Sequence, residues 1–302
     1  LGVVGESGCG KSVTAQSILR IVPDPGRIVE GQILYHRKRK ETDSFAMTDE
    51  VDLTALDPRG REIRQIRGGE ISMVFQEPMT TLAPIYTIGS QISEAIRLHQ
   101  NVSKSEAREK TIEVLSRVGM PKPTQTVDSY PHELSGGMRQ RGMIAMALSC
   151  HPSLLIADEP TTALDVTTEA QILDLMRHLQ DDLGMAIMYI THDLGVVAEM
   201  AEEVVVMYLG RVVEKADVDP LYYNPFHPYT RALLRSIPRI GKKVEELEAI
   251  EGMVPDPYAI PVGCPFHPRC PQAISGLCDE KDPPWLEVEP NHWVRCVLYE
   301  NG

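Results

Sequence analysis

One short segment near the start of the chain has the residues of a phosphate-binding loop. The run Gly5–Ser12 reads Gly-Glu-Ser-Gly-Cys-Gly-Lys-Ser, which is a complete G-x-x-x-x-G-K-S motif. Glycines at these positions let the backbone curl so that several N–H groups point at phosphate oxygens. The Lys11 ammonium can reach the β- and γ-phosphates, and the Ser12 hydroxyl is a typical Mg²⁺ ligand. The motif therefore predicts a bound nucleoside triphosphate with Mg²⁺.

The residues around this loop have the pattern that the motif requires. The apolar run Leu1–Val4 predicts a buried strand before the loop, and a helix is predicted from Lys11 to about Ile21. That helix directs the positive end of its dipole at the bound anion. We therefore expect the nucleotide to contact the loop and the start of the helix: Gly5, Glu6, Ser7, Gly8, Cys9, Gly10, Lys11, Ser12 and Val13.

Two adjacent carboxylates follow a second apolar run. Leu154–Ala157 is short and continuously apolar, which is typical of a strand buried on both faces of a parallel sheet. Burial of Asp158 at its end would be costly without a cation, so we interpret Asp158 as a Mg²⁺ ligand that acts jointly with Ser12. Glu159 comes next, where a carboxylate can orient or deprotonate the attacking water.

His192 follows a third apolar run, Met185–Ile190. Ligands of parallel α/β sheets gather beyond the carboxyl ends of the strands. His192 is therefore predicted to reach the region of the γ-phosphate. Further strands are expected at 33–35, 71–75, 204–208 and 211–213.

The composition of the whole chain argues against several classes of protein. The 302 residues carry a formal net charge of −13, and nucleic-acid binders normally have a basic excess, so no nucleic-acid partner is expected. No apolar run approaches the length of a membrane span, about 20 residues. No signal peptide is present, so we expect the chain to stay where it is made. Because it opens inside a strand-like run without an initiator Met, we interpret the chain as truncated at its N-terminus.

A further string, Leu134–Gly137, reads Leu-Ser-Gly-Gly and resembles the signature of the ATP-binding cassette (ABC) ATPases. Together with the phosphate loop and the carboxylate pair, it gives a resemblance that covers Leu1 to about Lys215. In that family the signature begins a helix whose free N–H groups face the γ-phosphate held by a partner subunit. The resemblance implies a head-to-tail dimer that sandwiches two ATP molecules, with three residues of this chain in the shared site: Ser135, Gly136 and Gly137.

The same resemblance assigns roles to other residues. It implies that Gln76 contacts Mg²⁺ and the attacking water, and that Asp165 lies in the dimer-contact loop. It also implies that Glu159 is the catalytic glutamate and His192 the switch histidine. The family places an adenine-stacking aromatic residue upstream of where this chain begins, so the expectation of ATP depends on the resemblance.

Several segments narrow the resemblance to the ATP-binding subunits of oligopeptide and dipeptide ABC transporters. They are Phe75–Leu82, Asp165–Thr168, Met207–Arg211, Asn224–Thr230 with Ile237-Pro238 beyond it, and Gly263–Cys270. Ala83 departs from that pattern, because relatives usually have Asn before the following proline.

Four cysteines crowd the end of the chain with the spacing C-x5-C-x7-C-x17-C: Cys264, Cys270, Cys278 and Cys296. An ATP-dependent protein without a signal peptide is expected in the cytosol, where disulfides are rare, so a metal centre is the favoured interpretation. Zinc sites prefer C-x2-C pairs, which are missing here, while four thiolates in irregular loops suit a [4Fe–4S] cluster. The subfamily resemblance also points to an iron–sulfur cluster. Zinc and metal-free thiols remain alternatives, and the simplest role is a staple that orders the segment.

These inferences give one expected architecture. The fold class is α/β, a P-loop NTPase of the ABC ATPase type, with a mostly parallel core sheet, an antiparallel β subdomain and a helical subdomain. The nucleotide-binding domain is expected to span residues 1–215, with the helical subdomain at about 78–134. A C-terminal extension with the four-cysteine metal site is expected to span 216–302.

The expected function is ATP hydrolysis that drives import of dipeptides or oligopeptides. The expected partners are a second ATPase subunit, identical or paralogous, two integral permease subunits and an extracytoplasmic solute-binding protein. The expected location is the cytoplasmic face of the cell membrane. One alternative is a transporter ATPase of the same fold that serves another solute, such as nickel or an oligosaccharide. Another alternative is a cassette ATPase with no role in transport.

Overall fold

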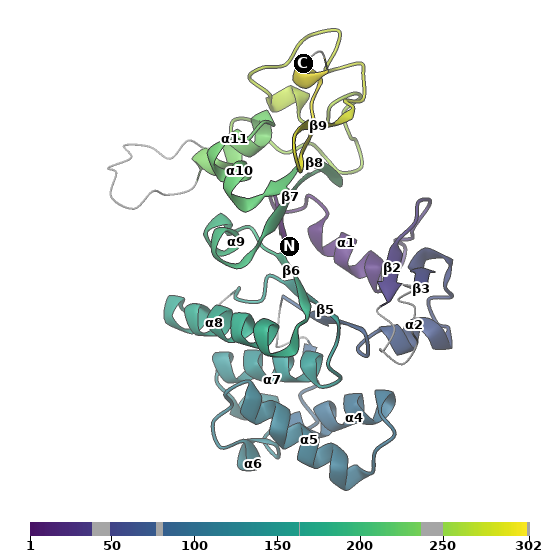
Figure 1. The fold of residues 1–302 in the computed structure, drawn as a ribbon, viewed down its shortest axis with the longest axis vertical. Coiled ribbons are helices and arrows are strands. Elements are labelled where there is room, and N and C mark those ends of the chain that lie inside the picture. The colour runs from purple at the N-terminus through teal and green to yellow at the C-terminus, as the bar shows by residue number, and fades with distance from the viewer. Residues whose placement is uncertain (38–48, 77–80, 163, 237–249, 301–302) are drawn as a thin grey trace. The chain divides into compact units, whose positions relative to one another are not determined.

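The computed structural model describes residues 1–37, 49–76, 81–162, 164–236 and 250–300 (Figure 1). Two compact units are present, one formed by residues 1–11 and 188–302 and the other by residues 12–187. Two parts of the predicted subfamily segments, Glu77–Thr80 and Ile237-Pro238, lie outside the described residues. The predicted division between residues 215 and 216 stays a prediction.

The first unit is built around a sheet whose strands follow the order β6 (Ala186–Ile190), β1 (Gly2–Val4), β7 (Glu203–Tyr208), β8 (Arg211–Asp217), β10 (His292–Arg295) and β9 (Trp285–Glu289). Strand β1 pairs in parallel with β6 and with β7, while β8, β10 and β9 add antiparallel neighbours. All three residues of β1 are buried, as expected for a short apolar strand inside a parallel sheet.

Helices α9 (Leu194–Met200), α10 (Val218–Tyr223) and α11 (Pro228–Arg235) complete the first unit. Its core includes three aromatic rings in mutual contact, those of Tyr208, Tyr229 and Phe266. Regular structure continues after Ala216, since α10, α11, β9 and β10 all lie there.

A buried carboxylate fastens this late segment to the sheet. Glu214 on β8 is fully buried and accepts hydrogen bonds from the backbone N–H groups of Phe226 (2.6 Å) and His227 (3.0 Å). His292 on β10 places its Nε2 2.7 Å from the same carboxylate. The N–H groups of Phe226 and His227 and the His292 ring thus compensate the burial of the Glu214 carboxylate.

The His227 ring marks the start of α11. Burial lowers the pKa of His227 to about 4, so its ring is neutral at pH 7, and its Nδ1 accepts from the Tyr229 N–H at the start of the helix.

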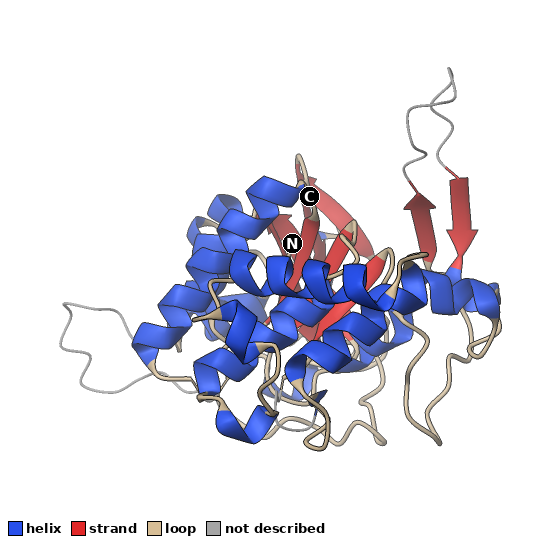
Figure 2. Ribbon diagram, turned by 90° about the horizontal axis from the view of Figure 1, so that it is seen from below, coloured by secondary structure: helices blue, strands red, loops and turns tan. Residues whose placement is uncertain are grey.

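The second unit contains the parallel strand pair β4 (Ile71–Val74) and β5 (Leu154–Asp158) and the antiparallel pair β2 (Leu34–Arg37) and β3 (Asp49–Asp52). Figure 2 shows β2 and β3 side by side. The helices of the region are α1 (Lys11–Ile18), α2 (Arg61–Ile66), α4 (Ile88–His99), α5 (Lys104–Arg117), α6 (Pro123–Thr126), α7 (Gly136–Leu148) and α8 (Val166–Leu183). Short 3₁₀ turns lie at Leu53–Ala55 and Pro131–Glu133 in this unit, and at His267–Arg269 and Val297–Tyr299 in the first unit.

Local signals set several helix boundaries in this unit. A capping box begins α5, since the Ser103 hydroxyl accepts from the Glu106 N–H and the Glu106 carboxylate accepts from the Ser103 N–H. The predicted end of α1 at about Ile21 is three residues too late. Arg20 has a φ of 54°, which is incompatible with a continuing helix.

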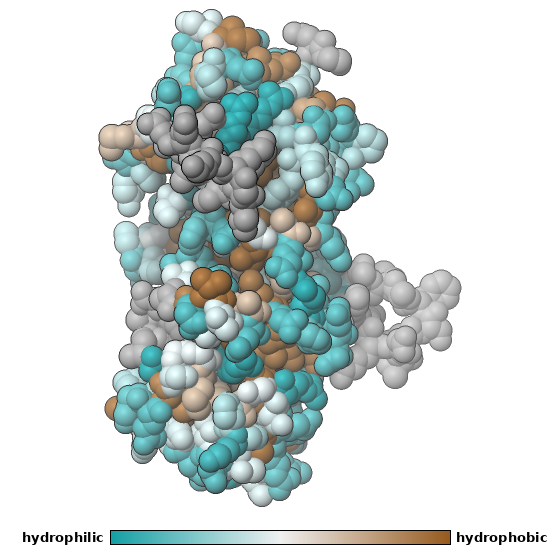
Figure 3. Space-filling model, turned by 90° about the vertical axis from the view of Figure 1, so that its left-hand side faces the viewer, coloured by the Kyte–Doolittle hydropathy of each residue, from teal (hydrophilic) through white to brown (hydrophobic). Residues whose placement is uncertain are grey.

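The face of the described residues that Figure 3 shows is mainly polar. Hydrophilic residues cover most of the face in Figure 3, with smaller hydrophobic patches between them. Among the helices of the described ranges, none has both the length and the apolar character that a membrane crossing requires.

Candidate nucleotide site

The backbone of the phosphate loop depends on its glycines. Gly8 and Gly10 have φ values of 79° and 99°, which side-chain-bearing residues rarely adopt. A Cβ on Gly5 would lie 2.3 Å from the carbonyl oxygen of Met207 on β7, so only glycine allows the loop to leave β1 here. The loop is closed by the Cys9 N–H, which donates to the Glu6 carbonyl (3.2 Å).

Lys11 folds back over this loop. Its side chain is buried, and its Nζ donates to the carbonyl oxygens of Gly5 (2.8 Å) and Glu6 (3.2 Å). The ammonium therefore lies inside the curl of the loop, in the position from which it could meet phosphate oxygens.

Ser12 and Asp158 are brought together although 146 positions separate them in the chain. The Ser12 hydroxyl donates to Oδ1 of Asp158 over 3.0 Å, and Asp158 is buried at the end of β5. Mg²⁺ prefers octahedral oxygen ligands at about 2.0–2.1 Å, so adjacent ligands lie about 3 Å apart. The pair therefore fits two neighbouring positions around this ion.

Glu159 is held by two side chains in a strained backbone conformation. Its Oε2 accepts from the Gln76 amide (3.0 Å) and from the Thr162 hydroxyl (2.9 Å). Its φ is 46°, which is costly for a residue with a side chain and is typical of functional positions. The sequence predicted Glu159 and Gln76 as site residues but not Thr162, which only the turn after β5 brings close.

His192 is exposed directly after β6 in the first unit. The next residue, Asp193, begins α9 and accepts from the Gly195 N–H (2.7 Å), which fixes where the strand ends and the helix starts. The predicted approach of His192 to the γ-phosphate stays a prediction.

The signature residues begin α7 in the second unit. The exposed Ser135 caps this helix by accepting from the Met138 N–H (3.3 Å), and Gly136 and Gly137 form its first turn. A Cβ on Gly137 would lie 2.9 Å from the Thr168 side chain on α8.

Asp165 caps α8 and is linked to the same threonine. Its carboxylate accepts from the Thr168 N–H (3.0 Å) and the Thr168 hydroxyl (2.7 Å), and these hydrogen bonds hold the pKa of Asp165 below its usual value. The signature and the predicted dimer-contact loop are therefore neighbours in this unit.

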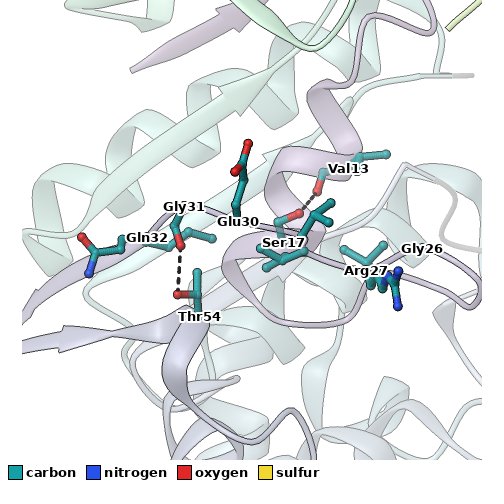
Figure 4. A pocket seen from close by; sticks show the side chains of 12 residues that line it. Val13, Ser17, Gly26, Arg27, Glu30, Gly31, Gln32 and Thr54 are labelled. Atoms are coloured by element: carbon teal, nitrogen blue, oxygen red, sulfur yellow. Dashed lines mark hydrogen bonds between the residues drawn. The ribbon is translucent and has the colours of Figure 1, made fainter. Parts of the chain in front are cut away.

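Val13 lies at the edge of an open pocket beside α1 (Figure 4). Its side chain is 53% exposed, and Ser17 on the next turn donates to the Val13 carbonyl (2.8 Å). Arg27 and Thr54 also line this pocket, and no motif in the sequence marks either residue.

The four clustered cysteines converge in the first unit. Cys264, Cys270, Cys278 and Cys296 line one small cavity, and all are free thiols. Burial raises the pKa of the Cys264 and Cys270 thiols and that of Cys296 to about 11. Among the described residues, no group of three or more His, Cys, Asp or Glu side chains is arranged to hold a metal ion. The iron–sulfur prediction and its zinc alternative are therefore not confirmed.

Family models match both ends of the chain. The model of the ABC transporter family matches residues 1–162, which contain the phosphate loop, the signature and the carboxylate pair. The model of the oligopeptide/dipeptide transporter C-terminal region matches residues 213–278, which contain three of the four clustered cysteines.

Individual relatives and solved structures agree with these matches. The chain is 50% identical to the oligopeptide transport ATP-binding protein AppD of Bacillus subtilis, over 99% of this chain and 87% of that protein. It is 46% identical to the dipeptide transport ATP-binding protein DppD of Escherichia coli, over 94% of this chain and 82% of that protein. A dimeric post-hydrolysis structure of the ATP-binding cassette MJ0796 with ADP and Pi matches with a TM-score of 0.59 and 26% identity, over 72% of this chain and 84% of that one.

Proposed function

The chain belongs to the ABC transporter family, and from this premise we propose that it is the ATP-hydrolysing subunit of a membrane importer of dipeptides or oligopeptides. The observation that carries the proposal is that one chain contains both the phosphate loop, signature and carboxylate pair of the ABC family and the C-terminal region of peptide transporters. The geometry of the loop and of the carboxylates supports the hydrolytic part.

Each residue of the site has a role in this proposal. The N–H groups of the loop and the Lys11 ammonium bind the β- and γ-phosphates. Ser12 and Asp158 would hold Mg²⁺, which would neutralise charge on the phosphates. Glu159 accepts a proton from the attacking water, Gln76 orients that water, and His192 senses the γ-phosphate.

The exposed Ser135 at the start of α7 supports a second ATPase subunit as a partner. A helix N-terminus with free N–H groups suits an anion presented from outside, here the γ-phosphate on a second ATPase subunit. Support comes from the dimeric state of the MJ0796 cassette. Opening and closing of such a dimer drives two permease subunits on the cytoplasmic side of the membrane, and an extracytoplasmic solute-binding protein delivers the peptide.

Reconstitution tests this function. The chain should co-purify with two permease subunits, and its ATP hydrolysis should rise when the solute-binding protein is loaded with dipeptide or oligopeptide. The control is the same assembly with unloaded binding protein. Stimulation by nickel or an oligosaccharide but not by peptides would contradict the cargo, while failure to associate with any permease would contradict the transport role.

We propose further that the four cysteines hold a [4Fe–4S] cluster. Their convergence on one cavity supports a shared ligand, since a cubane takes four cysteine thiolates. The thiols would have to lose their protons on binding, as cysteines do when they ligate metals. The cluster would act as a staple for the segment after Gly263.

The cluster gives an expected result for protein purified without oxygen. It should absorb broadly near about 400 nm and contain roughly four iron atoms per chain. Cys270→Ser should remove most of the iron and loosen the segment after Gly263 in hydrogen exchange. The matched control is Cys150→Ser, which changes a half-buried thiol of the second unit. Colourless protein with one zinc per chain would contradict the cluster.

A further inference from the structure

Glu6 in the phosphate loop is held by groups from the far end of the chain. Its backbone N–H donates to the hydroxyl oxygen of Tyr229 over 2.8 Å, across 223 positions of sequence. Its carboxylate forms a bidentate ion pair with Arg269, at 2.8 and 3.1 Å, across 263 positions. All of these residues belong to the first unit.

Arg269 is fixed in place on several sides. Its side chain is only 3% exposed, and it donates to the Glu251 carbonyl (3.0 Å) and the Tyr208 hydroxyl (3.3 Å). Its guanidinium also lies over the rings of Tyr208 and Phe266. A guanidinium with so little freedom defines the position of the carboxylate that it binds.

Tyr229 is equally constrained. It is fully buried on α11 between Tyr208 and Phe266, and burial raises the pKa of its hydroxyl above the usual value, so it stays neutral. A neutral phenol oxygen can accept the Glu6 N–H at any physiological pH. Two buried side chains therefore determine where Glu6 lies.

Glu6 in turn contacts the residue that meets the phosphates. Its carbonyl accepts from the Cys9 N–H, which closes the loop, and from the Lys11 Nζ. A shift of Glu6 would therefore move both the loop backbone and the ammonium.

We propose that Arg269 and Tyr229 are positioning residues for nucleotide binding, which act through Glu6 to hold the phosphate loop in its binding conformation. The C-terminal region is then part of the nucleotide site and not only a docking or metal-binding appendage. This inference rests on the nucleotide-binding role proposed above for the loop.

The test compares variants of the full chain, using ATP affinity of the chain and KM and kcat of the assembled transporter. Arg269→Met should raise Kd and KM for ATP about tenfold, as expected for loss of a bidentate charge-assisted contact, with kcat changed less than about twofold. Arg269→Lys should recover part of the affinity, because an ammonium restores the charge without the fork geometry. The double variant Arg269→Met with Glu6→Gln should raise KM for ATP no more than the single variant with the larger effect, because both changes break the same ion pair.

Arg295→Met is the matched control. Arg295 also precedes a cysteine of the cluster, and it donates to the Val212 and Pro283 carbonyls and lies over the Trp285 ring. The Arg295→Met change should leave KM for ATP unchanged. If Arg269→Met lowers kcat at constant KM, the variant has lost folded protein and the proposal is wrong. The proposal is also overturned if the effects of Arg269→Met and Glu6→Gln on KM are additive. An equal rise of KM in Arg295→Met would overturn it as well.

Two further measurements separate this positioning role from the proposed nucleotide site and from the proposed iron–sulfur cluster. If Lys11→Ala binds ATP with unchanged affinity, the nucleotide site proposed above is wrong. If Lys11→Ala loses ATP and Arg269→Met does not, only the positioning role is wrong. Iron per chain is measured in each variant, and a KM that rises only where iron is lost would also overturn direct positioning.

Discussion

Glu159→Gln is expected to leave ATP binding intact and to slow hydrolysis by about 10²-fold or more. The carboxamide fills the same space and can still meet Gln76 and Thr162, but it cannot accept a proton from water. The ATP-bound dimer should therefore accumulate. Single-turnover hydrolysis measures the rate, and size-exclusion chromatography with ATP measures the dimer.

Glu113→Gln provides the control for this prediction. Glu113 is an exposed carboxylate on α5 that pairs with Arg117 (3.1 Å), and its change should affect neither rate nor dimer. If the Glu159 variant hydrolyses ATP at nearly the normal rate in the reconstituted transporter, Glu159 is not the base.

Lys11→Ala and Ser135→Arg are expected to fail at different steps. Removing the Lys11 ammonium should weaken ATP binding to the isolated chain by about 10²-fold, because two charge-assisted hydrogen bonds to phosphate are lost. The change at Ser135 should leave that affinity unchanged, since this exposed residue caps the start of α7 and is assigned to the partner's nucleotide.

The Ser135 variant should instead be unable to form the closed dimer. A large cation at the helix cap fills the space that the partner's γ-phosphate requires, so hydrolysis should be lost although ATP binds. Titration of the isolated chain with ATP and chromatography of the dimer distinguish the two steps. An equal loss of affinity in both variants would contradict a site shared between subunits.

The fold was predictable where the signals are local. The glycines of the phosphate loop, the Ser103 capping box and the apolar runs before Asp158 and His192 each act within a few residues of sequence. The motifs therefore located the cassette without any knowledge of tertiary contacts.

The C-terminal region was harder to predict because its order comes from distant partners. Strand β10 exists because it pairs with β8, and its His292 meets the buried carboxylate of Glu214. Neither strand propensity nor periodicity around residue 292 reveals that carboxylate. The contact of Arg269 with Glu6 has no sequence signal either, since an arginine beside a cysteine is compatible with any surface loop.

The site itself was predicted in part. The sequence named Asp158, Glu159 and Gln76, but the positive φ of Glu159 and its contact with Thr162 depend on the turn that follows β5. Such a turn is determined by packing, and no residue in it is a glycine that would have marked the strained position.

The discontinuous first unit has a consequence for synthesis on the ribosome. Strand β1 is synthesised long before its two neighbours, which pair with it through Tyr189, Ile190 and Val204–Val206, so it waits for about 200 more residues. At about 5–20 residues per second this delay is roughly 10–40 s. Residues 12–187 are continuous in sequence and can begin to fold during that interval. We therefore expect a nascent chain released at residue 187 to contain the second unit but to lack the strands that pair with β1 before the phosphate loop, so that this incomplete product does not compete for ATP.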